Sequence, residues 1–230
     1  MSESHFWLSE AQFARLQPLL PNKPRGVPRV DDRRVISGIV HVLRTGCRWA
    51  DAPAVYGPRK TLYNRYVRWA KAGVWAEVFR ALADSGGPPA ELLLDSRSRG
   101  GRTTKIHVAT DELGRPRAVI LTPGQRGDSP VALALVGALP PPRRLIADAA
   151  YDSDGLRRFL SERGTEPVVP NNPTRKRKHA FDAAAYRARN AIERTFCRLK
   201  DWRRIATRYD RLAATFEAAV LIGAIVCYWL

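Results

Sequence analysis

One short segment of the chain carries side chains that could hold a cation and an anion together. Tyr186, Arg189, Glu193 and Lys200 lie in the segment YRARNAIERTFCRLK, at offsets of three, four and seven residues. In a helix these offsets place the four side chains along one ridge, beside an apolar strip. One acid is then held among two cations and a phenol. Ordinary pairing of surface charges four residues apart is the alternative that this segment alone leaves open.

Two further acids follow apolar runs of strand length. Asp95 comes directly after ELLL, and Asp148 comes directly after RLIA. Because α/β sheets bind ligands beyond the carboxyl ends of their strands, we expect both carboxylates to point into a crevice. An isolated aspartate in such a place can also begin a turn or cap a helix. That second interpretation is the one we favour for Asp152 and Asp154.

If Asp95, Asp148 and Glu193 converge, they could together form a metal-binding site. Three carboxylates at one point repel one another unless cations lie between them, and two Mg²⁺ or Mn²⁺ ions about 3.5–4 Å apart would meet that need. Carboxylate ligands without nearby His or Cys favour these ions over zinc. One ion would activate a water or a 3′-hydroxyl, and the other would stabilise the leaving oxygen. Arg189 and Lys200 would then hold DNA phosphates in line.

The elements that must position these acids change in pattern near residue 85. Residues 1–84 read as helical, residues 85–90 as a linker rich in Gly and Pro, and residues 91–230 as a mixed α/β domain. Strands are predicted in ELLLDS, TTKIHVATD, PRAVILT, RRLIADAAYD and TEPVVP, and helices in SPVALALVGAL and SDGLRRFLSERG. Residues 171–182 are polar and basic, which predicts a mobile loop that crosses a nucleic acid.

The first 84 residues predict a DNA-binding unit. Ser9 is a candidate N-cap for the helix in LSEAQFARLQPLL, and Gly46 is a candidate end for the helix in DDRRVISGIVHVLRT. NKPRGVPR between them is predicted as a loop. The next segment, KTLYNRYVRWAKAGVWAEVFRAL, begins as a basic amphipathic helix, so the whole resembles a helix-turn-helix reader. Phosphate contacts are expected from Lys60, Tyr63, Arg65 and Arg68; a helical bundle with an ordinary basic face is the alternative.

Bulk composition supports a polyanionic partner. The 230 residues carry a formal net charge of +17, with 39 Lys and Arg against 22 Asp and Glu. A membrane surface is the weaker choice, because the most apolar run, AAVLIGAIVCYWL, is too short to span a bilayer and reads as a buried terminal helix. The chain opens without a secretory pattern, and its three cysteines lack metal-type spacing. We therefore expect a cytoplasmic protein with reduced, mostly buried thiols.

Several of these segments together resemble a known family. The spacing Y-x2-R-x3-E-x6-K of residues 186–200 is similar to the signature of bacterial DDE-type insertion-sequence transposases, and among them to the insertion-sequence-five family. ELLLDS and LIADAAYDSDGLR resemble the segments that carry the family's first and second aspartates. GRTTKIHVATDELGRPRAVILTPGQRGDSPVA resembles the strands between them, and RTGCRWADAPAVYGPRKTLYNRYVRWAKAGVW resembles the DNA-binding region. The resemblance covers nearly the whole chain.

This resemblance implies a ribonuclease-H-like catalytic fold and a triad of Asp95, Asp148 and Glu193 that binds two Mg²⁺ or Mn²⁺ ions. It implies cutting of the element's terminal inverted repeats to expose a 3′-hydroxyl, followed by direct attack of that hydroxyl on target DNA. The implied partners are double-stranded DNA and, when two ends are paired, at least a second copy of the chain.

The sequence departs from the family pattern at two places. Asp95-Ser96 joins RSRGG almost at once, where relatives have a longer segment, and Gly127 stands where His is common, although Asp128 matches. A deletion after Asp95 could move it out of register with Asp148. Asp111 is the fallback for the first acid, though it reads better as a turn residue in TDELGR. The alternative to an active transposase is therefore a shortened, inactive relative that only binds DNA.

Overall fold

The computed structural model describes residues 5–22, 31–98 and 104–230, so most of the predicted loop NKPRGVPR and the end of the RSRGGR turn lie outside the described residues. Contacts within the chain define two compact units, one made of the residues up to Leu82 together with Arg198–Leu230, the other made of Ala83–Cys197. The expected division placed all of residues 91–230 in the catalytic domain. The structure instead groups the C-terminal 33 residues (198–230) with the N-terminal helices.

The first unit is helical and is built around the predicted helices. Ser9 caps the first helix through a reciprocal capping box with Gln12, and Gly46 ends the second helix with φ 76°, as expected. Gly73 (φ 74°) divides the predicted long third helix in two. The helices are α1 (Glu10–Leu16), α2 (Asp32–Thr45), α3 (Arg59–Lys71), α4 (Val74–Asp84), α9 (Arg203–Ala206) and α10 (Ala213–Ala224), with one-turn elements η1 (Gln17–Leu19), η2 (Trp49–Asp51), η3 (Ala54–Tyr56) and η6 (Ile225–Trp229).

The C-terminal apolar run forms the buried helix that its composition predicts. Most of α10 is buried, and the hydroxyl of Tyr66 on α3 donates a hydrogen bond to the Thr215 carbonyl. Arg204 on α9 donates to the Cys47 carbonyl at 2.9 Å. These contacts explain why the C-terminal residues join this unit. Within the described residues, no helix has the length and apolar character needed to cross a membrane.

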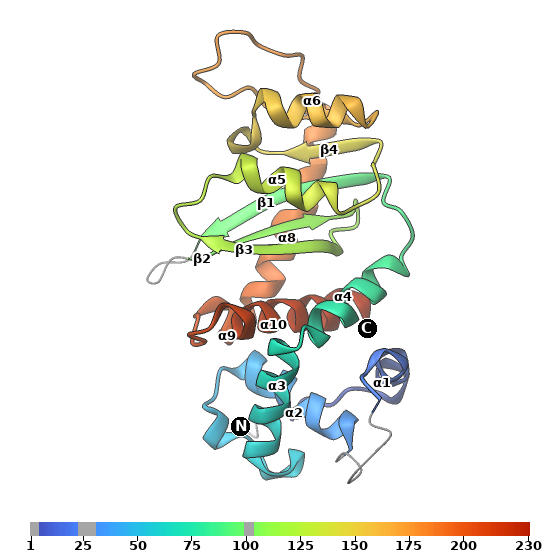
Figure 1. Cartoon of the computed structure of the whole chain (residues 1–230), viewed down its shortest axis with the longest axis vertical. Helices are drawn as coiled ribbons and strands as arrows, with labels where there is room; N and C mark the ends of the chain where they lie inside the picture. The colour runs from blue at the N-terminus through green and yellow to red at the C-terminus, as the bar shows by residue number, and fades with distance from the viewer. Residues whose placement is uncertain (1–4, 23–30, 99–103) are drawn as a thin grey trace. The chain divides into compact units, whose positions relative to one another are not determined.

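The second unit is a five-stranded mixed sheet with helices on both faces (Figure 1). The strand order is β3-β2-β1-β4-β5; β1 is antiparallel to β2 and parallel to β4. The strands are β1 (Glu91–Ser98), β2 (Thr104–Thr110), β3 (Pro116–Pro123), β4 (Arg144–Ala147) and β5 (Glu166–Val168). The helical elements are α5 (Asp128–Gly137), η4 (Ala149–Tyr151), α6 (Asp154–Glu162), α7 (Ala183–Tyr186), η5 (Arg187–Arg189) and α8 (Asn190–Lys200). This is the mixed α/β domain that the sequence predicts, with the ribonuclease-H-like arrangement that the family resemblance implies.

The two faces of the sheet are covered by different helices. Alternate residues of β1 point to opposite faces, so Leu92 and Leu94 pack in the core that α5 and α6 share with the sheet. The other face is covered by α8, where the Arg97 guanidinium lies 5.9 Å from the Phe196 ring centre and Thr195 donates to the Gly114 carbonyl at 2.6 Å. Figure 1 shows α5 and α8 on opposite sides of the strands.

Two expectations need correction. The connection between α2 and α3 holds two one-turn elements, η2 and η3, and is longer than the three- or four-residue turn of a helix-turn-helix. The cysteines are free thiols, as predicted, but Cys197 is exposed and Cys47 and Cys227 are only partly buried. Cys197 lies on the outer face of α8, which turns Phe196 and Leu199 toward the interior.

Gly38 provides a test of the helical packing. A Cβ built on Gly38 would lie 2.7 Å from Tyr56 Cβ and 3.0 Å from a Leu62 methyl carbon, whereas one on Gly155 in α6 would meet no atom within 4 Å. We expect Gly38→Ala to lower the free energy of unfolding by about 1–3 kcal/mol through overpacking. Gly155→Ala should raise it by about 0.5–1 kcal/mol. Urea unfolding followed by circular dichroism would measure both, and an unchanged Gly38→Ala protein would contradict the close approach.

Candidate active site

Asp95 and Asp148 are neighbours because the strands that carry them are parallel and adjacent. In the β1–β4 register Leu94 is the partner of Ala147, so the next residue of each strand is one of the two acids. Asp95 is 3% exposed, and the side chain of Asp148 is 35% exposed. Asp148 directly follows the end of β4, as predicted, whereas Asp95 lies within β1, at the point where its pairing with β4 ends.

The short segment after Asp95 leaves this register in place. β1 continues past Asp95 and pairs with β2, with Asp95 opposite Val108 and Ser98 opposite Lys105. The same strand keeps its parallel pairing with β4 up to Leu94. Asp95 therefore stands beside Asp148 in spite of the departure from the family pattern.

Glu193 reaches the two aspartates from the first turn of α8, where the helix dipole favours a carboxylate. The link is the guanidinium of Arg189. Its Nη1 lies 2.5 Å from Glu193 Oε1, and its Nη2 lies 3.1 Å from Asp95 Oδ1 and 3.7 Å from Asp148 Oδ2. The three acids singled out in the sequence converge on one arginine. Arg189, which we expected to hold a DNA phosphate, is here an ion-pair partner of all three carboxylates.

The environment of Asp95 is unfavourable for a negative charge. Its Oδ1 accepts a hydrogen bond from the Ser96 amide at 2.8 Å, while its buried Oδ2 has no hydrogen-bond partner and lies 3.7 Å from Arg97 Nε. Burial raises the pKa of Asp95, and the positive charge of Arg189 opposes that rise. The nearby guanidinium of Arg189 thus stabilises the ionised form of Asp95.

The donor set suits a hard divalent cation, although the carboxylates surround a guanidinium here. Within the described residues, no three side chains of the His, Cys, Asp or Glu type are grouped closely enough to hold one metal ion. The three acids offer only carboxylate oxygens, which Mg²⁺ and Mn²⁺ prefer. Oδ2 of Asp95 is a possible ligand atom that has no hydrogen-bond partner. The donor chemistry therefore suits such ions, although in this arrangement the acids are held apart around the guanidinium.

Tyr186 and Lys200 differ in their relation to this site. The side chain of Tyr186 is partly buried; burial raises its pKa, Arg189 lowers it, and the site carboxylates raise it further. Its ring packs edge-on against Phe181 at 5.3 Å. Lys200 is exposed at the end of α8, about two turns beyond Glu193. The structure thus brings Tyr186 to the triad and leaves Lys200 as a solvent-facing cation.

A partly buried polar cluster lies next to Asp95 on the other face of β1, and sequence reasoning singled out only Asp128 of its members. Asp128 Oδ1 accepts hydrogen bonds from Ser96 Oγ at 2.9 Å and Lys105 Nζ at 3.0 Å, and lies 3.6 Å from Nδ1 of the fully buried His107. Polar residues at alternate positions of TTKIHVAT were the available signal. The cluster fixes Ser96, whose amide holds Asp95.

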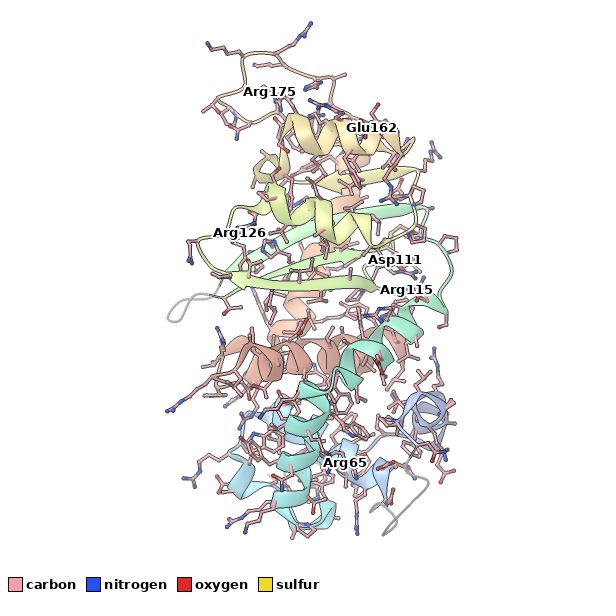
Figure 2. All side chains as sticks on the ribbon, viewed as in Figure 1. Arg65, Asp111, Arg115, Arg126, Glu162 and Arg175 are labelled. Carbon is pink, nitrogen blue, oxygen red and sulfur yellow. The ribbon has the colours of Figure 1, made fainter. Side chains whose placement is uncertain are left out.

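Asp111, the fallback for the first acid, is the turn residue that its segment predicts. Its Oδ1 accepts from the amides of Leu113 at 3.1 Å and Arg115 at 2.9 Å, and its Oδ2 pairs with Arg115 Nε at 2.7 Å. Figure 2 labels Asp111 and Arg115 at the turn between β2 and β3. These bonds use the carboxylate within the turn, so Asp95 is the better first acid.

On α3, the prediction for Arg65 is wrong. Its side chain is 4% exposed, forms an ion pair with Asp32 and lies 4.8 Å from the Trp69 ring centre, so it cannot reach a phosphate (Figure 2). The helix turns Arg65 inward with Leu62, Tyr66 and Trp69 because these residues share one face. Lys60, Tyr63 and Arg68 are exposed on the outer face. Lys60 and Tyr63 also line a shallow pocket of about 180 Å³ with Trp49.

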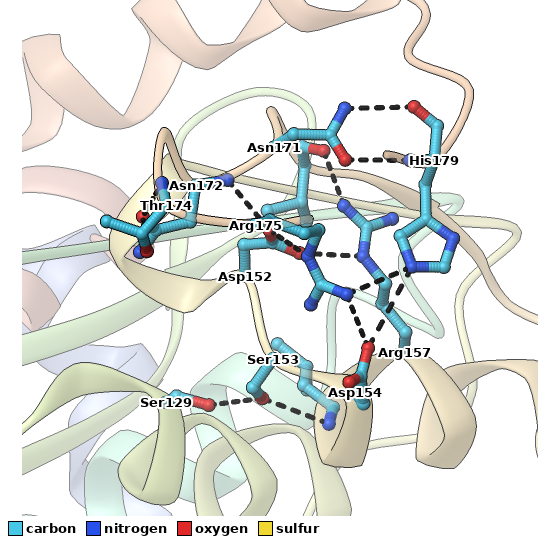
Figure 3. Close-up of polar contacts among 12 residues, drawn as sticks. Ser129, Asp152, Ser153, Asp154, Arg157, Asn171, Asn172, Thr174, Arg175 and His179 are labelled. Carbon is cyan, nitrogen blue, oxygen red and sulfur yellow. Dashed lines mark hydrogen bonds and ion pairs between the residues drawn. The ribbon is translucent and has the colours of Figure 1, made fainter. Parts of the chain in front are cut away.

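The basic segment 171–182 is held at its base rather than left loose (Figure 3). The Asn171 amide donates to the His179 carbonyl at 2.9 Å and accepts from the His179 amide at 2.8 Å, which closes a loop. The fully buried side chain of Asp152 accepts from Arg157 Nε, from Arg175 Nε, both at 2.7 Å, and from the Asn172 amide at 2.8 Å. The loop presents Lys176, Arg177 and Lys178 to solvent.

Asp152 is therefore an anchor, which differs from the turn or cap role that its segment predicts; Ser153 caps α6 instead. Burial raises the pKa of Asp152, but hydrogen bonds from Asn172, Arg175 and Arg157 outweigh it and lower the value from 3.8 to about 2. Asp154 pairs with the same Arg175 at 2.5 Å from an exposed position. The two acids form a matched pair for a test.

We expect Asp152→Asn to lower the free energy of unfolding at pH 7 by about 2–4 kcal/mol and to speed tryptic cleavage at residues 176–178. Because the folded pKa is lowered, the stabilisation from the charge, about 2 kcal/mol, is complete above pH ~4 and is lost as pH falls through about 2. The difference from wild type should shrink over that range. Denaturation at several pH values would measure it. Asp154→Asn is the control with little effect, and equal effects of the two changes would contradict the anchor.

Comparison with known proteins agrees with this geometry. Residues 95–230 match the family described as "Transposase DDE domain", and residues 8–79 match "Putative transposase of IS4/5 family". The Brucella ovis protein "Putative transposase for insertion sequence element IS6501" is 39% identical over 129 residues, which are 56% of this chain and 98% of the relative. The Burkholderia cepacia protein "Putative transposase for insertion sequence element IS402" is 35% identical over 144 residues, 58% of this chain and 65% of the relative.

A solved structure, the "CryoEM structure of simian T-cell lymphotropic virus intasome in complex with PP2A regulatory subunit B56 gamma", has a chain that matches 58% of this chain and 47% of its own length, with TM-score 0.40 and 18% identity. That likeness is too distant to add to the assignment. The match to the transposase domain spans more than half of the residues and includes all three converging acids. The chain accordingly belongs to the DDE-domain transposases of bacterial insertion elements.

Proposed function

We propose that this transposase binds the terminal inverted repeats of its insertion sequence and catalyses metal-dependent strand cleavage and strand transfer with Asp95, Asp148 and Glu193. The observation that carries the proposal is the convergence of these three carboxylates on Arg189. Two strands and one helix, far apart in sequence, deliver acids to one point. An ordinary ion pair on one helix would involve only Arg189 and Glu193. Here two aspartates from other elements also approach the same guanidinium.

Each acid has a distinct role in the proposal. Asp95, buried and with one unpaired oxygen, would hold divalent ions from within the sheet, and the more exposed Asp148 and Glu193 would complete the set from the solvent side. Bound Mg²⁺ or Mn²⁺ would supply an activated oxygen nucleophile and charge stabilisation at the leaving oxygen. Tyr186 and Lys200 would hold the phosphates of the bound strand, as would Arg189 when it is free of the acids.

Two exposed basic surfaces would bind the duplex. One is the outer face of α3 with Lys60, Tyr63 and Arg68; the other is the tip of the anchored loop, residues 176–178. Asp152, which holds the loop, follows Asp148 after the single turn of η4, so the anchor of the loop lies close in sequence to the active site. We also propose at least a dimer for the complex that pairs two ends.

The rival proposal is an inactive relative that still binds DNA, motivated by the short segment after Asp95. The β1–β4 register argues against it, because a slip of one residue would have turned Asp95 to the other face of the sheet.

The first test is nicking of a labelled duplex that carries the DNA flanking this reading frame. With Mg²⁺ or Mn²⁺ we expect the wild type to cut at the 3′ end of the element, and Asp148→Asn and Glu193→Gln to lose the activity by about 10³-fold or more, because each change removes a charged metal ligand. Glu162→Gln, at an exposed acid of α6, is the control that should cut normally. End binding without nicking by wild type would favour the inactive relative.

The α3 surface gives a second prediction, on the salt dependence of binding. The double variant Lys60→Ala/Arg68→Ala should bind the duplex more weakly. The slope of the logarithm of the association constant against the logarithm of the salt concentration should fall in magnitude by about 2, since each lost phosphate contact removes about 0.9 from it. Arg143→Ala with Arg158→Ala removes the same charge from exposed positions of the other unit. Fluorescence anisotropy over 50–300 mM salt would measure both. Equal slopes for the two double variants would show a general charge effect and contradict a docking role for α3.

A further inference from the structure

Arg189 supplies positive charge to the same three acids that are proposed to bind divalent ions. Its Nη2 lies between Asp95 Oδ1, at 3.1 Å, and Asp148 Oδ2, at 3.7 Å, and its Nη1 contacts Glu193 at 2.5 Å. A divalent ion held by the same three carboxylates would bring its charge close to the guanidinium, and two cations so close repel each other. The guanidinium and the ion carry like charges and compete for one set of ligands.

The guanidinium also fits this place imperfectly. Its Nε is buried without a hydrogen-bond partner, and so is Oδ2 of Asp95. Buried polar groups in native proteins are normally paired, and unpaired ones are costly. The arrangement neutralises the acids but leaves a donor and an acceptor unsatisfied within the same cluster.

We infer that Arg189 is the resident cation of the metal site in the free protein, and that metal loading displaces it from the three carboxylates. The displaced guanidinium keeps its planar, forked donors, which suit a phosphate group as well as a carboxylate. Arg189 would therefore serve in turn as a counter-ion of the empty site and as a phosphate ligand of the loaded one. This inference rests on the proposed function, because it assumes that the triad binds the metal.

The inference predicts that removal of Arg189 improves metal binding, which a merely structural role would not do. Mn²⁺ titration followed by electron paramagnetic resonance, without DNA, measures the affinity independently of activity. We expect Arg189→Gln to bind Mn²⁺ at least about tenfold more tightly than wild type, because the ion no longer competes with a cation. Arg187→Gln, at an exposed arginine of the same turn, should bind like wild type, and Glu193→Gln should bind much more weakly.

The outcomes separate the inference from the proposed function. Unchanged or weaker binding by Arg189→Gln, with binding still lost in Glu193→Gln, overturns the role of Arg189 and leaves the metal site standing. Mn²⁺ binding that is unaffected by Glu193→Gln overturns both. If Arg189→Gln folds only in the presence of Mn²⁺, that supports the inference directly, because the ion then replaces the missing charge. Arg189→Lys, whose ammonium cannot reach three acids at once, should fold and show an intermediate affinity; wild-type affinity in this variant would contradict the competition.

Discussion

Three carboxylates can meet inside a folded chain only if positive charge is placed among them. Asp95, Asp148 and Glu193 meet around Arg189, and the burial of Asp95 makes that dependence strong. The rest of the catalytic unit can be understood from this requirement. Parallel pairing of β1 with β4 sets the two aspartates side by side, and η5 and α8 bring one arginine and one glutamate to them from the face that α8 covers.

The same solution recurs a few residues further along the chain. Asp152 is buried like Asp95, but two arginines and a backbone amide satisfy it fully, so its pKa falls where that of Asp95 rises. This difference in hydrogen bonding suits the two carboxylates to different roles. A saturated carboxylate is a stable anchor, here for a basic loop, whereas a carboxylate with an unpaired oxygen remains able to accept another cation. Neighbouring acids of one unit thus differ in function through their partners rather than their residue type.

Local sequence patterns predicted much of this fold. Short apolar runs predicted the five strands, and Ser9 and Gly46 mark helix ends as expected. Asp95 and Asp148, each directly after an apolar run, follow residues that pair in adjacent strands. Some of the failures concern which way a side chain points once elements pack. Arg65 looked like a phosphate ligand because it lies among basic residues, yet Asp32 and Trp69 hold it inside the helical unit.

By itself, the sequence determined the family and the elements that carry the three predicted acids, because residue type and local periodicity are written in the chain. Only the tertiary structure decided that the residues after Arg198 pack with the N-terminal helices, that Asp152 anchors the basic loop and that Arg189 faces acids. These outcomes depend on the long-range register of strands and on the burial of charge. Both involve residues that are far apart in the chain, so local sequence patterns do not predict them.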